Sequence, residues 1–434
     1  MKNRILFLPT RYFPSISGAE FYLQRMAEIL NKKYNYEVKI FTSNAIDFKA
    51  LRDSSGKIIN KNENNYDKVN NLKIHRFPVF YDILIEDQMK FIKNIDAYNL
   101  IELSDDCLQE LIKNGPYLPD LIEVSFSTVN TDYKLIHTTF FPYFNLVIAL
   151  ILGKQLDIPV IITPFFHFSN PRYLEPALIE VLTKFDLIIA CTHIEKINIA
   201  NITGISEEKI IVIPMGVDIE KFESTPKSNG RKFFFKEHYF EKNEKNYKMV
   251  LYCGYKNFEK GALSVLKSIS HIVNEIKKVY FVFIGPTTMA YNRELSHLEK
   301  KYRRRIINLT PDNLTGYFDR KKIAAFKEAD LYLMPSRSDA FGISFLEAWA
   351  AGKPVIGANI GATPHVINNG IDGYLVEFNN PKDISEKVVK LLKSKRLRKS
   401  FGTAGKEKVK SSYTWDLIAE KTHNTYQHLI NVRD

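Results

Sequence analysis

Two carboxylates stand eight residues apart in the stretch SDAFGISFLEAWAAGKPVIG, residues 338–357. Asp339 follows an apolar run typical of a buried strand, and Glu347 lies in a run that predicts a helix closed by Gly352. Gly342, between the two acids, would let a ligand approach the backbone closely. The N–H groups at the start of the helix favour a phosphate. Glu347 has apolar neighbours and needs donors, which ribose hydroxyls would supply.

Glycines and lysines stand where other expected strands pass into helices. Lys256 and Lys260 flank a turn in CGYKNFEKGALSVLKSI, residues 253–269, and a lysine at the carboxyl edge of a parallel sheet can pair with a diphosphate. Gly18 occupies a similar turn in FLPTRYFPSISGAE. A solvated lysine and a helix-entry glycine are the structural alternatives, and both stay open on these segments alone. Neither segment carries the GxGxxG dinucleotide fingerprint.

These residues sit on strand-like runs that alternate with helical stretches such as residues 18–33. The first series of expected strands covers residues 4–9, 37–43, 72–77, 121–126, 159–166, 187–191 and 209–214. The second series covers residues 248–254, 279–285, 305–310, 331–336, 353–359 and 373–378. Two such series predict two doubly wound α/β domains. The polar stretch 214–247 is the expected boundary between them.

The bulk properties restrict the class of protein. The 434 residues carry 61 Lys and Arg against 49 Asp and Glu, and this net charge of +12 favours phosphate-bearing partners. The three cysteines, Cys107, Cys191 and Cys253, form no CxxC pair, which argues against a disulfide framework or a zinc site. The apolar run 145–152 is too short to span a bilayer and predicts a buried helix. With no signal peptide evident, we expect a cytoplasmic location.

Several motifs, in order along the chain, together resemble the retaining, GT-B-fold glycosyltransferases of glycosyltransferase family 4. They are SGAEFYLQRMAEIL, ITPFFHF, VIPMGVDIEKF, CGYKNFEKG and the stretch with the two acids. The resemblance implies an α/β GT-B fold with two doubly wound Rossmann-like domains facing across a cleft. It implies an acceptor-side domain over residues 1–213, completed by a C-terminal helix over 413–434, and a nucleotide-sugar donor domain over 214–412.

The resemblance also implies roles for individual residues. Glu347 would hold the ribose hydroxyls, Asp339 the transferred sugar, and Lys260 the diphosphate. His167 would contact the donor sugar or the reacting centre. The residues implied are His167 and Asp339 as catalytic groups, and Gly18, Lys256, Lys260, Tyr317, Ala340, Phe341, Gly342, Ile343 and Glu347 as donor-binding groups.

The implied activity is that of a retaining, metal-independent hexosyltransferase. It would move a sugar from a UDP- or GDP-sugar to a hydroxyl of a glycan, a lipid-linked molecule or a small molecule, with no cofactor and no metal. The sequence departs from the family pattern at three places. Asp339 stands where Glu is usual, Tyr255 where Arg is usual, and Phe165 where His is usual. These changes leave open an alternative, a sugar-nucleotide-binding protein without turnover.

Two other classes of protein fit the sequence less well. A nucleic-acid-binding protein would fit the charge of +12, but the sequence has no recognisable nucleic-acid module. A nicotinamide dehydrogenase would need the GxGxxG fingerprint. The basic segment KSKRLRKS, residues 393–400, leaves open a peripheral contact with an anionic membrane at the inner face, against the alternative of a solvated helix face.

Overall fold

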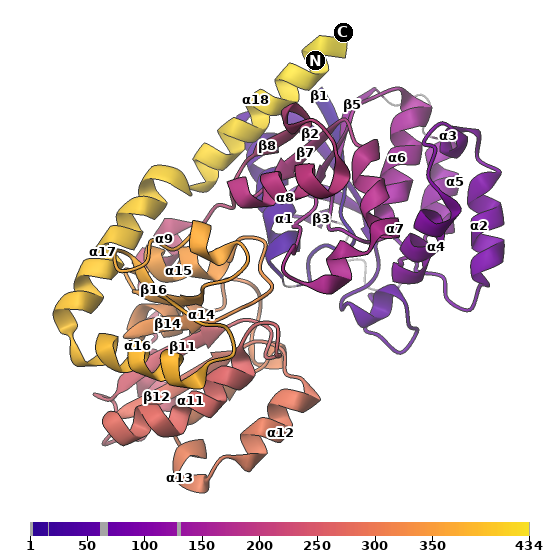
Figure 1. The fold of residues 1–434 in the computed structure, drawn as a ribbon. Coiled ribbons are helices and arrows are strands. Elements are labelled where there is room, and N and C mark those ends of the chain that lie inside the picture. Colours follow the sequence, from indigo (N-terminus) through magenta and orange to yellow (C-terminus); the bar gives the residue numbers. More distant parts are fainter. Residues whose placement is uncertain (1–2, 16, 61–67, 128–131, 434) are drawn as a thin grey trace. The chain divides into compact units, whose positions relative to one another are not determined.

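The computed structural model describes residues 3–15, 17–60, 68–127 and 132–433 (Figure 1). The chain divides into two compact units. The first unit contains Met1–Pro214 and Ile418–Asp434, and the second contains Met215–Leu417. Each unit has its own largely parallel sheet, as expected for two doubly wound α/β halves, and each is described separately.

The first unit is built on an eight-stranded sheet in the order β3-β4-β2-β1-β5-β6-β7-β8. Its strands are β1 (Asn3–Leu8), β2 (Tyr36–Ser43), β3 (Lys68–Val69), β4 (Leu72–Phe77), β5 (Tyr133–Thr139), β6 (Val160–Thr163), β7 (Leu187–Ala190) and β8 (Ile210–Val212). Only β3 pairs antiparallel among these strands. The strand order reverses between β1 and β5, and ligands of such sheets bind outside the carboxyl ends of the strands at this point.

Helices connect these strands in the first unit. They are α1 (Gly18–Lys33), α2 (Ile85–Lys93), α3 (Asp96–Asn99), α4 (Asp105–Asn114), α5 (Pro119–Ser127), α6 (Asn145–Leu156), α7 (Pro176–Ile179) and α8 (His193–Thr203). The structure confirms the helix expected over residues 18–33. It also confirms the buried helix expected over residues 145–152, which α6 contains. Among the described helices, none combines the length and the apolar character that a membrane span requires.

One expected strand of the first series is wrong. Residues 121–126 lie in helix α5, and the strand beside β1 is β5, which the sequence analysis did not predict. Pro119 stands at the first position of α5 and Asp120 in its first turn, and both residues favour a helix start. A short apolar run does not distinguish a buried strand from a buried helix segment by periodicity alone, so these flanking residues were the better signal.

The second unit contains a six-stranded parallel sheet in the order β13-β12-β11-β14-β15-β16. Its strands are β11 (Lys248–Cys253), β12 (Val279–Ile284), β13 (Ile306–Leu309), β14 (Leu331–Met334), β15 (Val355–Ala358) and β16 (Gly373–Val376). All six were expected. The order reverses between β11 and β14, so this sheet also has a switch point at its carboxyl edge.

The helices and the small antiparallel ribbon of the second unit complete its fold. The helices are α9 (Ile219–Glu223), α10 (Phe235–Tyr239), α11 (Ala262–Glu275), α12 (Met289–His297), α13 (Lys300–Arg303), α14 (Arg320–Glu328), α15 (Ile343–Ala350), α16 (Pro381–Lys393) and α17 (Lys395–Ser412). The ribbon pairs β9 (Lys227–Ser228) with β10 (Arg231–Lys232). Helix α18 (Trp415–Arg433) begins in the second unit and contributes Ile418 onward to the first.

Helix α15, which carries Glu347, is held against α17 by small residues. A Cβ atom at Gly405 would lie 1.9 Å from Cδ1 of Trp349, and one at Gly402 would lie 2.1 Å from the carbonyl oxygen of Gly352. Trp349 is fully buried, and its Nε1 donates to the carbonyl of Asp372 at 2.9 Å. Glycine at position 405 is therefore what lets α17 pack directly on the indole.

We expect Gly405→Ala to destabilise the second unit by roughly 1–2 kcal/mol, because overpacking against Trp349 outweighs the better helix propensity of alanine. Both tryptophans of the chain, Trp349 and Trp415, belong to this unit. Urea unfolding followed by tryptophan fluorescence therefore reports on it. Thr403→Ala, on the exposed side of α17, is the matched control and should change stability by less than about 0.5 kcal/mol. Equal stability of the two variants would contradict the packing argument.

Candidate functional site

The candidate site lies at the carboxyl edge of the second unit's sheet, where the loops after β11 and β14 meet. Gly261 precedes α11 with φ of +72°, in the left-handed region. A Cβ atom there would lie 2.2 Å from the carbonyl oxygen of Pro335, which follows β14. Glycine at this position therefore allows the two loops to touch, and this contact occurs at the switch point of the sheet.

Polar contacts join the same two loops. The backbone N–H of Arg337 donates to the carbonyl of Glu259 at 2.8 Å, and the Arg337 guanidinium also pairs with the Glu259 carboxylate. The ammonium of Lys260 donates to Asp339 Oδ1 at 2.7 Å and to the Ser338 carbonyl at 2.7 Å. The structure thus brings together Lys260 and Asp339, which the sequence analysis assigned to neighbouring parts of one ligand.

One carboxylate oxygen of Asp339 remains available as a hydrogen-bond acceptor. Its side chain is 13% exposed, and Lys260 pairs with Oδ1. The second oxygen, Oδ2, is buried and has no hydrogen-bond partner within the part of the chain that the structure describes. Leaving a buried acceptor unsatisfied costs about 1–3 kcal/mol. A hydroxyl group of a ligand would remove that cost.

The loop continues into the N-terminus of α15. Ala340 and Phe341 are buried, Gly342 has φ of +89°, and Ile343 begins the helix. A Cβ atom at Gly342 would lie 2.6 Å from Cδ2 of Phe345. The positive φ would also strain the backbone of any residue other than glycine. The first N–H groups of a helix have no partner within it. With Lys260 nearby in the same loop cluster, this end of α15 favours an anion.

Glu347 is paired in a way that the sequence analysis missed. It is only 1% exposed, and its Oε1 accepts from the ammonium of Lys322 at 2.7 Å. That ammonium also lies 3.7 Å from the centroid of the Tyr317 ring. The structure therefore brings Tyr317 and Glu347 together through Lys322 on α14. Residues 320–328, RKKIAAFKE, are rich in basic residues and suggest a solvated face, so the sequence offered no clear signal for Lys322.

Lys256 is placed differently from Lys260. It is fully buried, and its ammonium donates to the Leu309 carbonyl at 2.8 Å and to the side chain of Asn308. Burial lowers its pKa to about 8. The structure therefore places the Lys256 ammonium at the end of β13 and does not bring it to the pair of Lys260 with Asp339. Tyr255, where the family usually has Arg, is 43% exposed.

The remaining predicted residues, Gly18 and His167, belong to the first unit. Gly18 begins α1. Next to it, Glu20 accepts from Arg11 at 2.6 Å in a buried pair, and the Arg11 guanidinium covers the Phe48 ring at 3.6 Å. The sequence alone does not mark this pair, although Glu20 directly follows the Gly18-Ala19 turn.

The loop that carries His167 is fixed by a buried acid. Glu195 is fully buried and accepts from the N–H groups of Phe166 at 2.7 Å and Cys191 at 2.6 Å. Burial raises the pKa of Glu195 to about 8, against the lowering effect of these hydrogen bonds. The imidazole of His167 lies against Tyr173, with 4.8 Å between ring centroids. Glu195 was also missed, because nothing in its local sequence marks it as buried.

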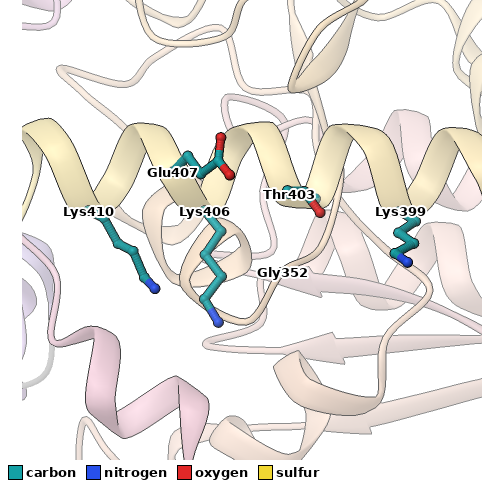
Figure 2. A pocket seen from close by; sticks show the side chains of 7 residues that line it. Gly352, Lys399, Thr403, Lys406, Glu407 and Lys410 are labelled. Atoms are coloured by element: carbon teal, nitrogen blue, oxygen red, sulfur yellow. The ribbon is translucent and has the colours of Figure 1, made fainter.

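A separate hollow of about 230 Å³ lies along α17 (Figure 2). It is lined by Gly352, Lys399, Gly402, Thr403, Lys406, Glu407 and Lys410. Lys406 and Lys410 approach the carboxylate of Glu223 at 2.9 Å and 3.9 Å. None of the predicted site residues lines this hollow, so it is distinct from the candidate site.

Both family models that match the chain, and the relatives named below, are glycosyltransferases. Residues 109–221 match the family model Glycosyltransferase Family 4, and residues 234–408 match the model Glycosyl transferases group 1. The chain is 22% identical over 439 residues to the uncharacterized glycosyltransferase MJ1069 of Methanocaldococcus jannaschii, covering 99% of this chain and 100% of the relative. It is 23% identical over 258 residues to a D-inositol 3-phosphate glycosyltransferase of Corynebacterium jeikeium, covering 58% and 59%.

Among solved structures, HepE of Anabaena in complex with UDP and glucose resembles the chain with a TM-score of 0.70 at 14% identity. That alignment covers 98% of this chain and 100% of HepE. At this identity the likeness shows the fold alone, and that fold is GT-B. The sequence matches add the enzyme class, and with them the chain belongs to glycosyltransferase family 4 as a glycosyltransferase of GT-B fold.

Proposed function

We propose that this glycosyltransferase is a retaining, metal-independent hexosyltransferase that uses a UDP- or GDP-sugar. The observation that carries the proposal is the arrangement around the start of α15. Asp339 and Glu347 stand on either side of Gly342, and the ammonium of Lys260 lies against Asp339. This arrangement offers acceptors for two sets of hydroxyls and positive charge for the phosphates.

Each group has a separate task in the proposed site. Glu347, inside the helix, accepts hydrogen bonds from the ribose. Asp339, in the loop, accepts from a hydroxyl of the transferred sugar through Oδ2, the oxygen that Lys260 leaves available. Lys260 and the first N–H groups of α15 balance the charge of the diphosphate. Lys256 stays outside this set, because its ammonium is committed to the end of β13.

The donor and the acceptor are proposed for different units. HepE binds UDP, which supports a uridine nucleotide here, and GDP is the second candidate. The acceptor is a hydroxyl compound bound by the first unit. In the same unit, Gly18 begins α1 and His167 lies in the loop after β6, and the resemblance assigns these two residues to the donor and the reacting centre. A lipid-linked acceptor and a contact with an anionic membrane are compatible with the net charge of +12.

In a retaining transfer of this kind, the protein mainly positions the reactants and stabilises the departing diphosphate. The chain supplies positive charge without a metal, through Lys260 and the N-terminus of α15. The alternative is a protein that binds the sugar nucleotide but does not turn it over. The observation that favours this alternative is Asp339, whose side chain is one methylene shorter than the usual Glu and forms an ion pair with Lys260.

We expect Glu347→Gln and Asp339→Asn to act differently. Glu347→Gln should weaken both the sugar nucleotide and the bare nucleoside diphosphate, by roughly 1–3 kcal/mol, because the ribose is present in both. Asp339→Asn should leave the affinity for bare diphosphate nearly unchanged and lower kcat, because it acts on the sugar. Calorimetry and donor turnover measure the two effects. Equal losses of diphosphate affinity would contradict this division of roles.

We expect Gly342→Ala to weaken binding of the nucleoside diphosphate, because a Cβ atom would meet Phe345 and displace the start of α15. The matched control is Gly370→Ala, since Gly370 also has a left-handed φ, +81°, but a Cβ atom there meets nothing within 4 Å. Both variants carry about 1–2 kcal/mol of backbone strain, and Gly342→Ala carries the additional cost of the contact with Phe345, so the stability of each variant is measured beside its affinity. If both variants bind the ligand equally well, the start of α15 does not contact it.

We expect UDP or GDP to bind with unchanged affinity after EDTA treatment. The reason is that Lys260 and the helix N-terminus, not a divalent cation, balance the diphosphate charge in the proposed site. Calorimetry with and without EDTA, followed by addition of Mg²⁺ or Mn²⁺, measures this directly. Loss of binding on chelation, with recovery on adding metal, would contradict the metal-independent mechanism.

A further inference from the structure

The pair formed by Lys322 and Glu347 is the most enclosed ion pair of the candidate site. The two side chains are only 8% and 2% exposed, and 2.7 Å separates Nζ from Oε1. The neighbouring pair of Lys260 with Asp339 is more open, with 22% and 13% exposed. A buried carboxylate without a cation favours its protonated form. The ammonium of Lys322 therefore balances the buried charge of the Glu347 carboxylate.

Lys322 is itself held firmly. It lies on α14, and its ammonium bonds to Glu347 at 2.7 Å. The N-cap residue of α14 is Asp319, whose carboxylate accepts from the N–H of Lys321 at 2.7 Å and from the N–H of Thr315 at 2.8 Å. These bonds tie the preceding loop, which carries Tyr317, to the start of the helix. The ammonium of Lys322 consequently has a fixed place between the loop and α15.

Tyr317 completes a cluster of three side chains from three segments. Its ring lies below the Lys322 ammonium at 3.7 Å, a favourable cation–π contact. Glu347 also contributes to raising the pKa of the Tyr317 hydroxyl. The Lys322 ammonium donates to Oε1 of the carboxylate. An ionised carboxylate has about four acceptor positions, so this donor leaves capacity for a diol.

Two further charged residues act on this cluster, Asp218 on Tyr317 and Lys256 on Cys253. Burial raises the pKa of the Cys253 thiol to about 12, so the thiol stays protonated. The pKa of Tyr317 is raised well above its usual value by burial and by Glu347, so its hydroxyl keeps its proton and remains a donor. Lys322 is therefore the cation that the described contacts provide for Glu347.

We propose that Lys322 is a positioning residue for the nucleotide ribose. It balances the charge of the Glu347 carboxylate and orients it, so that the carboxylate accepts both hydroxyls of a ribose and the site prefers ribonucleotides over 2′-deoxyribonucleotides. The inference rests on the proposed function, in which Glu347 holds the ribose. It goes further, because it assigns the sugar preference of the nucleotide to a residue on a different helix.

The test compares UDP and GDP with their 2′-deoxy forms by calorimetry. The wild-type protein should prefer the ribonucleotide by about tenfold or more, as expected when a site built for a hydroxyl meets an analogue without it. Lys322→Met should weaken the ribonucleotide by about tenfold and the deoxy form much less, so that the preference falls toward one. Glu347→Gln should reduce the preference in the same way.

Three further variants make the result specific. Lys322→Arg keeps the charge and should retain most of the preference. Lys321→Met removes a neighbouring charge from the same helix and should change neither affinity. The double variant of Lys322→Met with Glu347→Gln removes both buried charges, so it avoids an unpaired one. It should bind no more weakly than Glu347→Gln alone, because the two residues act as a unit.

The outcomes separate the inference from the function on which it rests. If the wild-type protein does not distinguish ribose from deoxyribose, the ribose role of Glu347 is wrong, and the inference is overturned with it. If wild type and Glu347→Gln behave as expected but Lys322→Met keeps the full preference, only the role of Lys322 is overturned. Equal weakening of both nucleotides by Lys322→Met, with additive losses in the double variant, would show a purely structural role.

Discussion

The carboxylate of Glu347 is buried in a helix whose other side chains are apolar except for Ser344, and a charge there requires a cation close by. That requirement connects elements that lie far apart in the sequence. Lys322 supplies the cation from α14, 25 residues before the acid. The position of α15 is in turn set by its contact with α17, where Gly405 leaves room for Trp349. The geometry of one carboxylate thus depends on the packing of three helices.

Close backbone approach is the second constraint on the site. Gly261 lets the loop after β11 touch the loop after β14. Without that contact, Lys260 and Asp339 would not meet, because they belong to different strand-to-helix loops. The doubly wound sheet brings these loops to one edge, since its order reverses between β11 and β14. The strand order thus brings the two loops to the same edge of the sheet, and Gly261 allows the short distance between them.

The sequence was sufficient for what depends on local pattern. Strand runs, the helix over 18–33 and the stretch around Gly342 could be identified from apolar periodicity and turn residues. The run 121–126 was assigned wrongly, because a short apolar segment fits a strand and a helix equally well. Lys322 and Glu195 could not be found, since each is defined by a partner distant in sequence or by burial that the tertiary structure creates. Lys256 shows the same limit, because its neighbours in sequence do not reveal that its side chain turns toward β13.

The two ion pairs of the site differ in how readily a ligand can rearrange them. The pair of Lys260 with Asp339 keeps partial contact with water, so its ammonium can exchange part of its contact for a phosphate at modest cost. The pair of Lys322 with Glu347 is almost fully enclosed, and separating it would leave an unpaired charge in an apolar surrounding. The first pair therefore fits its proposed role toward groups that move during transfer, the diphosphate and the sugar. The second fits its proposed role toward a part of the donor that stays in place, the ribose.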